Sequence, residues 1–175
     1  MINSKPNGIK NSKGEQKYKS GLYIPINKDK FIKLNSQGGL YWRSGWEKKI
    51  FIYLDSNPNI IRCGAEFLGI PYMWIRPEDG DIKETEHLYY PDFYYDLRCP
   101  DGTIKHVIAE VKPYKESTPP KLPEKYTHNQ LKAFEYDMIQ WNKNQCKWKY
   151  VIDYCDKKGF EFCVITEKWF NGYIK

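Results

Sequence analysis

The sequence lacks any apolar run approaching the roughly 20 residues of a membrane-spanning helix, and its lysine-containing N-terminus lacks an apolar signal segment. It also lacks a Cys-x-x-Cys pair, because its five cysteines are scattered, and its three histidines do not have the spacing of metal ligands. These absences argue against a membrane protein, a secreted disulfide framework and a zinc site. We expect an intracellular protein with reduced thiols.

Net charge is missing from most of the chain. Residues 41–175 carry twenty basic and twenty acidic residues, whereas residues 1–40 carry eight lysines and two acids. The whole excess of +6 therefore lies in the first forty residues, which predicts a basic, partly extended N-terminal arm. Such an arm binds DNA phosphates or tethers the protein to a partner, and the alternative is a solubilising tail. Residues 41–175 are expected to form one domain.

Hydrophobic periodicity and turn residues predict an α/β (α+β) fold with a mixed β-sheet flanked by helices. Helices are predicted over residues 44–56, 128–141 and 144–158, with a last helical turn at 167–173. Strands are predicted over 60–63, 67–75, 89–97, 105–111 and 160–166. Polar or Pro-rich loops are predicted over 76–86 and 113–127. Gly159 is expected to end the third helix as a C-cap.

Two acids and a lysine lie on the two strands around a hairpin turn. Cys99-Pro100-Asp101-Gly102-Thr103 suits a three-residue loop whose flanking residues pair, and this register places Asp92 opposite Glu110. Opposed side chains have Cβ atoms about 4.5–5.5 Å apart. Lys112, two residues beyond Glu110, points to the same face.

Two carboxylates this close repel each other unless a cation lies between them. A hard divalent ion is the natural candidate, and we expect Mg²⁺, with Mn²⁺ as an alternative. Asp92 and Glu110 would be its ligands, with the backbone carbonyl of Val111 as a further one. The other interpretation is an exposed polar face on which Lys112 forms a salt bridge with a carboxylate. The opposition of two acids favours the metal.

Glu47 is a third acid with two possible roles. Ser44 and Glu47 form the capping box of the first predicted helix, which is a purely structural role. Glu47 also lies on the apolar stripe of Ile50 and Leu54, where a buried acid needs a partner. It is a candidate for both cap and metal-site residue. Glu66, after the next strand, could touch the metal site, although an exposed turn is the expectation we favour.

A helical Glu, then Pro-Asp, then Glu-x-Lys on adjacent strands resembles the PD-(D/E)xK nuclease superfamily. Over residues 40–170 the chain is similar to the head completion nucleases of tailed phages, and less closely to TnsA-type transposon endonucleases. The segments that carry the similarity are Tyr41–Glu47, Asn57–Ile61, Ile70–Tyr72, Tyr90–Phe93, Glu110–Pro113, Lys147–Trp148 and Phe162–Glu167. The resemblance implies a restriction-endonuclease-like fold with Glu47, Asp92, Glu110 and Lys112 as catalytic residues.

These observations predict a Mg²⁺-dependent nuclease that hydrolyses double-stranded DNA, with Lys112 stabilising charge at phosphorus and Glu47 supporting the metal. Gln130, Gln145 and Lys147 are secondary candidates on the later helices. The resemblance implies trimming or cutting of packaged DNA in the host cytoplasm before heads and tails join, with portal or neck proteins as partners and retention in the virion neck as an option. The alternatives are a structural neck protein with a degenerate nuclease fold and a transposition or repair endonuclease.

Overall fold

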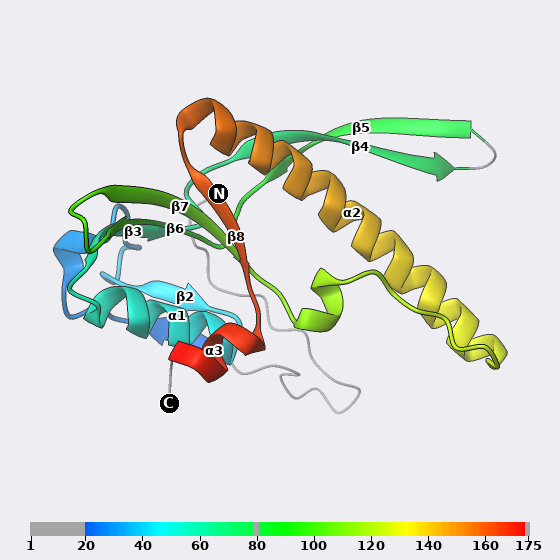
Figure 1. Cartoon of the computed structure of the whole chain (residues 1–175), viewed down its shortest axis with the longest axis horizontal. Helices are drawn as coiled ribbons and strands as arrows, with labels where there is room; N and C mark the ends of the chain where they lie inside the picture. Colours follow the sequence, from blue (N-terminus) through cyan, green and yellow to red (C-terminus); the bar gives the residue numbers. More distant parts are fainter. Residues whose placement is uncertain (1–19, 79–80, 174–175) are drawn as a thin grey trace. The chain divides into compact units, whose positions relative to one another are not determined.

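The computed structural model describes residues 20–78 and 81–173 (Figure 1). The chain divides into two compact units. The first unit comprises Met1–Gly69 and Tyr90–Ala109, and the second comprises Ile70–Tyr89 and Glu110–Lys175. Among the described residues, no helix is both long enough and apolar enough to cross a membrane.

The first unit is built on an antiparallel sheet with one helix. Its strands β3 (Ile60–Ala65), β6 (Phe93–Arg98) and β7 (Ile104–Val111, which continues into the second unit) lie in the order β3-β6-β7. A parallel bridge between Phe31 and Cys63 makes the strand pairing mixed. A short ribbon of β1 (Gly21–Tyr23) and β2 (Leu40–Trp42) precedes helix α1 (Gly45–Ser56).

Helix α1 begins where the sequence predicts, because Ser44 caps it. The Ser44 hydroxyl accepts a hydrogen bond from the backbone N–H of Glu47 at 3.1 Å. The carboxylate of Glu47 does not close the capping box at Ser44 and instead accepts from the backbone N–H of Arg43 at 2.9 Å. The apolar stripe that contains Ile50 and Leu54 is buried, as expected from its spacing.

The hairpin of β6 and β7 has the predicted turn. The N–H of Cys99 donates to the carbonyl of Thr103, and Gly102 takes the left-handed conformation with φ of +85°. The register runs without interruption from this turn to Phe93 opposite Ala109, as the turn predicts, and the predicted pair of Asp92 and Glu110 lies one residue beyond the paired strands. Strand β6 begins at Phe93 and not at residue 89, because Pro91 lacks the N–H that a strand position supplies.

Residues 20–40, the second half of the predicted arm, pack onto α1, while residues 1–19 lie outside the described residues. The buried carboxylate of Asp55 accepts hydrogen bonds from the Tyr23 hydroxyl at 2.6 Å and from the backbone N–H groups of Ile26 and Asn27 at 2.8 and 2.9 Å. The ring of Tyr23 stacks on Phe51 of α1. The apolar stretch of the predicted arm is thus docked in the first unit.

The second unit contains a long hairpin that the sequence did not predict. Strands β4 (Ile70–Glu78) and β5 (Asp81–Tyr89) pair antiparallel along their whole length. The predicted polar loop over 76–86 is therefore wrong. Apart from buried Tyr89, the residues of β5 are exposed or half-buried on both faces, so the apolar alternation that signals a strand is absent there.

One continuous helix, α2 (His128–Lys158), replaces the two predicted helices over 128–141 and 144–158. No Gly or Pro lies at residues 142–143, so nothing in the backbone chemistry stops the helix. Thr127 and Gln130 close a full capping box at its start, and Gly159 ends it in the left-handed conformation as predicted. In Figure 1, α2 runs beside the hairpin of β4 and β5, and Tyr150 packs against Tyr72.

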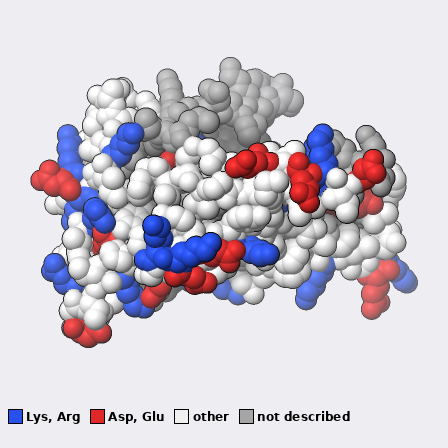
Figure 2. Space-filling model, turned by 90° about the horizontal axis from the view of Figure 1, so that it is seen from above, with Lys and Arg blue, Asp and Glu red and all other residues white. Residues whose placement is uncertain are grey.

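The rest of the second unit follows the predicted order. A 3₁₀ turn, η2 (Tyr114–Ser117), interrupts the Pro-rich loop, and β8 (Glu161–Ile165) leads to α3 (Glu167–Tyr173). The N–H of Lys112 donates to the carbonyl of Ile165, so β8 lies beside the end of β7. With its mixed strand pairing and helices, the chain has the predicted α+β, restriction-endonuclease-like fold class. Figure 2 shows basic and acidic side chains interspersed on one face of the molecule, with uncharged surface between them.

Candidate active site

Three carboxylates of the first unit line one small hollow. They belong to Glu47 on α1, Glu66 after β3 and Asp92 before β6, and the apolar floor includes Phe51 and Phe93. Two of these acids, Glu47 and Asp92, are predicted site residues. The structure therefore brings a helical and a strand-flanking acid together, as the motif requires.

Arg43 supplies positive charge beside this hollow. Its guanidinium forms a bidentate ion pair with Glu66, with one contact at 2.7 Å. The pKa of Arg43 is raised by its hydrogen bonds to Glu66, against an opposing effect of burial, and the charges of Glu47 and Asp92 raise it further. Arg43 therefore remains a fixed cation facing three acids.

Glu66 is a component of the hollow, so the favoured expectation of an exposed turn is wrong and Glu66 lies beside the predicted acids Glu47 and Asp92. Its side chain is only 18% exposed, and its backbone takes a left-handed φ of +48°, which is unusual for a residue with a Cβ. The backbone N–H of Glu66 donates to the carbonyl of Asp92 at 3.3 Å, and the ion pair with Arg43 holds its side chain. The only sequence signal was an acid close after a strand, which is too common to be specific.

Burial raises the pKa of Glu47, although hydrogen bonds from Arg43 and Ser44 and the charge of Arg43 partly oppose the rise. A nearby cation stabilises the ionised form of a carboxylate in this environment. Glu47 lies in the first turn of α1 and also lines the hollow, whereas its predicted role at a metal site stays a prediction.

The second unit contains the other two predicted catalytic residues. Glu110 is 4% exposed at the end of β7, and its Oε2 accepts a hydrogen bond from the Tyr89 hydroxyl at 2.6 Å. The Nζ of Lys112 lies 3.4 Å from Oε1 of Glu110. The salt bridge of the alternative interpretation is therefore present, but Glu110 is buried and not on an exposed face. Val111 lies between them at the last position of β7.

The secondary candidates on α2 have different surroundings. The ammonium group of Lys147 lies 5.4 Å from the centre of the Tyr89 ring, which connects it to the partner of Glu110. Gln130 is used in the helix cap, and 17 residues separate it from Lys147, about 25 Å along an α-helix. Gln145 lies on the same helix, two residues before Lys147.

No group of three or more His, Cys, Asp or Glu side chains is arranged to hold a metal ion within residues 20–78 and 81–173. This does not conflict with a magnesium ion, which binds through one or two carboxylates and keeps its remaining positions for water and substrate phosphates. The donors near the predicted site are carboxylates, whose oxygen atoms are the ligands that a hard cation prefers. The residue types fit a hard divalent cation.

Comparison with known proteins identifies the class of this fold and site. Residues 57–167 match the model of the TnsA-like endonuclease N-terminal family. The chain therefore belongs to the TnsA-like endonucleases and is a nuclease.

A characterised relative makes the assignment more specific. The chain is 31% identical over 148 residues to the head completion nuclease of Enterobacteria phage T4, which covers 85% of this chain and 91% of that protein. The resemblance inferred from the sequence motifs is confirmed.

Proposed function

We propose that this nuclease cleaves DNA with Mg²⁺ during completion of a phage head. The observation that carries this proposal is the hairpin register. Asp92 directly precedes Phe93, and Glu110 directly follows Ala109, at the last pair of β6 and β7. In the register predicted from the turn, the two acids of the motif oppose each other, with Lys112 two residues beyond Glu110.

In this proposal each side chain has one role. Asp92 and Glu110 hold the ion together with the Val111 carbonyl, and Glu47 supports it from α1. A bound Mg²⁺ would supply charge neutralisation at the phosphate and a more acidic water. Lys112 stabilises negative charge at phosphorus, and Tyr89 fixes the orientation of Glu110 by its hydrogen bond. Buried, hydrogen-bonded carboxylates keep their geometry when substrate arrives.

The extent of the similarity to the T4 head completion nuclease favours a role in head completion over one in transposition. A TnsA-like match alone is compatible with an enzyme that acts on transposon ends. The similarity to the T4 protein covers nearly all of that relative, beyond the catalytic segments. We propose that the protein acts on packaged DNA in the host cell during assembly, in contact with portal or neck proteins.

Plasmid cleavage tests the enzymatic part of the proposal. The wild-type protein should nick or linearise plasmid DNA with Mg²⁺, and EDTA should stop the reaction. Glu110→Gln should abolish cleavage because one ligand loses its charge. Asp153→Asn, on the exposed part of α2, is the matched control and should cleave normally.

Two outcomes would reject the proposal. A folded wild-type protein that does not cut DNA with Mg²⁺ or Mn²⁺ would indicate a structural role at the neck. Cleavage by Glu110→Gln at the wild-type rate would show that the protein is a nuclease but that this active-site assignment is wrong. Co-purification with phage heads tests the assembly role separately.

A further inference from the structure

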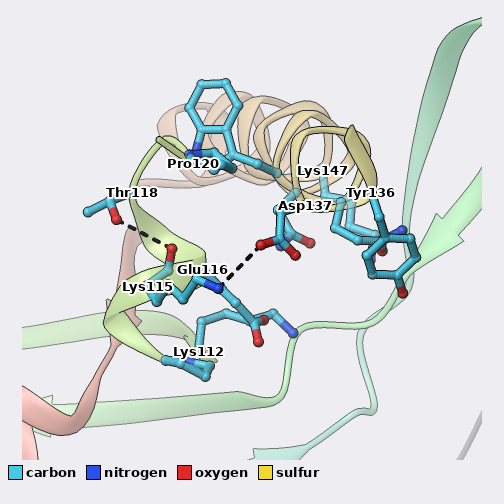
Figure 3. A pocket seen from close by; sticks show the side chains of 12 residues that line it. Lys112, Lys115, Glu116, Thr118, Pro120, Tyr136, Asp137 and Lys147 are labelled. Carbon is cyan, nitrogen blue, oxygen red and sulfur yellow. Dashed lines mark hydrogen bonds and ion pairs between the residues drawn. The ribbon is translucent and has the colours of Figure 1, made fainter. Parts of the chain in front are cut away.

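A pocket of about 380 Å³ lies within the second unit, between α2 and the segment that contains η2 (Figure 3). Lys112 and Pro113 line it where β7 ends, and α2 contributes one face between Tyr136 and Lys147. Its volume lies at the small end of the ~300–1,000 Å³ typical of small-ligand sites. The pocket therefore suits one small ligand beside the candidate catalytic lysine.

Positive charge predominates in this pocket. Three lysines, Lys112, Lys115 and Lys147, line it against the two acids Glu116 and Asp137. Lys115 and Asp137 form an ion pair across it at 3.3 Å, which Figure 3 shows between the η2 segment and α2. Lys112, which also pairs with Glu110, and Lys147 are the lysines of the lining that can attract an anion.

The helix face offers flat apolar surface and neutral hydrogen-bonding groups. Trp141 lines the pocket, and its buried indole Nε1 has no hydrogen-bond partner among the described residues. Gln140 and Asn144 lie beside it on the same face of α2 and can both donate and accept hydrogen bonds. An aromatic ring with amide groups is the surface on which a nucleobase stacks and presents its edge.

We propose that this pocket binds one unpaired nucleotide of the DNA strand, with its phosphate near Lys112 and Lys147 and its base against Trp141 and Asn144. The inference rests on the proposed function and narrows its substrate. A base inside a duplex must be extruded at an energetic cost before it can enter, whereas an overhanging base enters directly. The nuclease therefore selects DNA ends that carry unpaired nucleotides over blunt or closed duplex.

Binding in the absence of metal separates this inference from catalysis. Fluorescence anisotropy in EDTA compares two labelled hairpin oligonucleotides, one blunt and one with a short single-stranded overhang. The wild-type protein should bind the overhang about tenfold more tightly, the order expected from stacking one base on an aromatic side chain. The double variant Gln140→Ala/Asn144→Ala keeps Trp141 but removes the amide groups that contact the base edge, so it should reduce this preference and keep its affinity for the blunt hairpin.

Lys149→Ala, on the exposed face of α2 and outside the pocket, should retain the full preference. If the double variant does not fold, the isosteric Asn144→Asp places a carboxylate in the pocket and should remove the preference by repelling the strand. Equal affinity of wild type for both hairpins, or a preference that these substitutions leave unchanged, would overturn the inference. Overhang selection in a protein that never cleaves DNA would support the pocket and reject the proposed nuclease mechanism.

Discussion

Lys112 Nζ and Glu110 Oε1 lie 3.4 Å apart, two positions from each other at the end of β7. A lysine and a carboxylate at this spacing neutralise each other when no other ion is bound. A metal on Glu110 would compete with this ion pair and leave the ammonium group available to a phosphate. The pair therefore couples ligand binding at the acid to the position of the lysine.

Lys112→Ala should remove charge stabilisation while leaving the metal ligands in place. We expect DNA cleavage to fall by about 10²–10³, as for loss of one such group. Mg²⁺ affinity, measured by calorimetry, should be unchanged or higher, because a competing cation has gone. Asp92→Asn should differ by weakening both Mg²⁺ binding and cleavage. Wild-type cleavage by folded Lys112→Ala would remove this lysine from the mechanism.

Tyr89→Phe should loosen Glu110 without changing its charge. The substitution removes the 2.6 Å hydrogen bond and leaves a buried carboxylate oxygen without that donor, at a cost of about 1–3 kcal/mol. Because Tyr89 is a positioning residue, we expect a higher Mg²⁺ concentration for half-maximal cleavage and little change at saturating Mg²⁺. Tyr126→Phe, at an exposed site, is the control. An unchanged Mg²⁺ dependence would contradict this role.

Glu47→Gln should stabilise the fold at neutral pH and impair cleavage. Burial raises the pKa of Glu47 above its unfolded value near 4.3, so the native state binds this proton more readily than the unfolded state. The ionised carboxylate therefore destabilises the fold above its native pKa, and this penalty disappears below about pH 4. The unfolding temperature of Glu47→Gln should be higher than that of the wild type at neutral pH, and this difference should fade in acid. Exposed Glu84→Gln should unfold at the wild-type temperature at both pH values. A destabilised variant at neutral pH would contradict the assigned cause.

Asp55→Ala should detach residues 21–30 from α1. Burial alone would raise the pKa of Asp55, but hydrogen bonds from Tyr23 and the backbone of Ile26 and Asn27 lower it. Removing the carboxylate leaves several donors without an acceptor, and we expect a loss of about 3 kcal/mol or more. Hydrogen exchange should rise in residues 21–30, while Asp29→Ala, on an exposed residue, should leave it unchanged. Unaltered exchange in Asp55→Ala would show that other contacts hold the segment.

Deletion of residues 1–19 should weaken DNA binding by removing charge alone. This part of the chain carries five lysines and one acid. Affinity for duplex DNA and the slope of its logarithm against salt concentration should both decrease. The cut at residue 20 keeps the packed part of the arm, including Tyr23, so unfolding temperature serves as the control. Unchanged DNA binding with loss of incorporation into heads would identify a protein tether.

The parts predicted from sequence are those that local chemistry determines. Ser44 and Gly159 begin and end helices through their own side chain or backbone freedom, and the 99–103 turn sets the register of its hairpin. Strand β5 depends instead on its partner β4, and its polar sequence gives no period-two signal. The sequence analysis divided α2 at residues 142–143, although no Gly or Pro lies there to stop the helix.

In the candidate site, too, residues with local sequence signals were predicted and residues that depend on distant partners were not. Glu47 and Asp92 were identified by their spacing to helix and strand signals, whereas the contribution of Glu66 depends on Arg43, 23 residues earlier in the chain. Tyr89 was assigned to the wrong strand, so its contact with Glu110 could not be anticipated. Contacts between residues distant in sequence carry no local pattern from which to infer them.

The unbroken course of α2 imposes a rule on changes of chain length. Each residue inserted into an α-helix rotates the residues that follow it by about 100° about the helix axis. A single insertion near Asp137 would rotate Gln140, Asn144 and Lys147 out of the pocket together, even if every one of them were retained. An insertion of seven residues, close to two turns, would return them to nearly their original direction. Length variants of this helix that keep the pocket should therefore differ by whole turns, because only whole turns return the pocket-lining side chains to the same face.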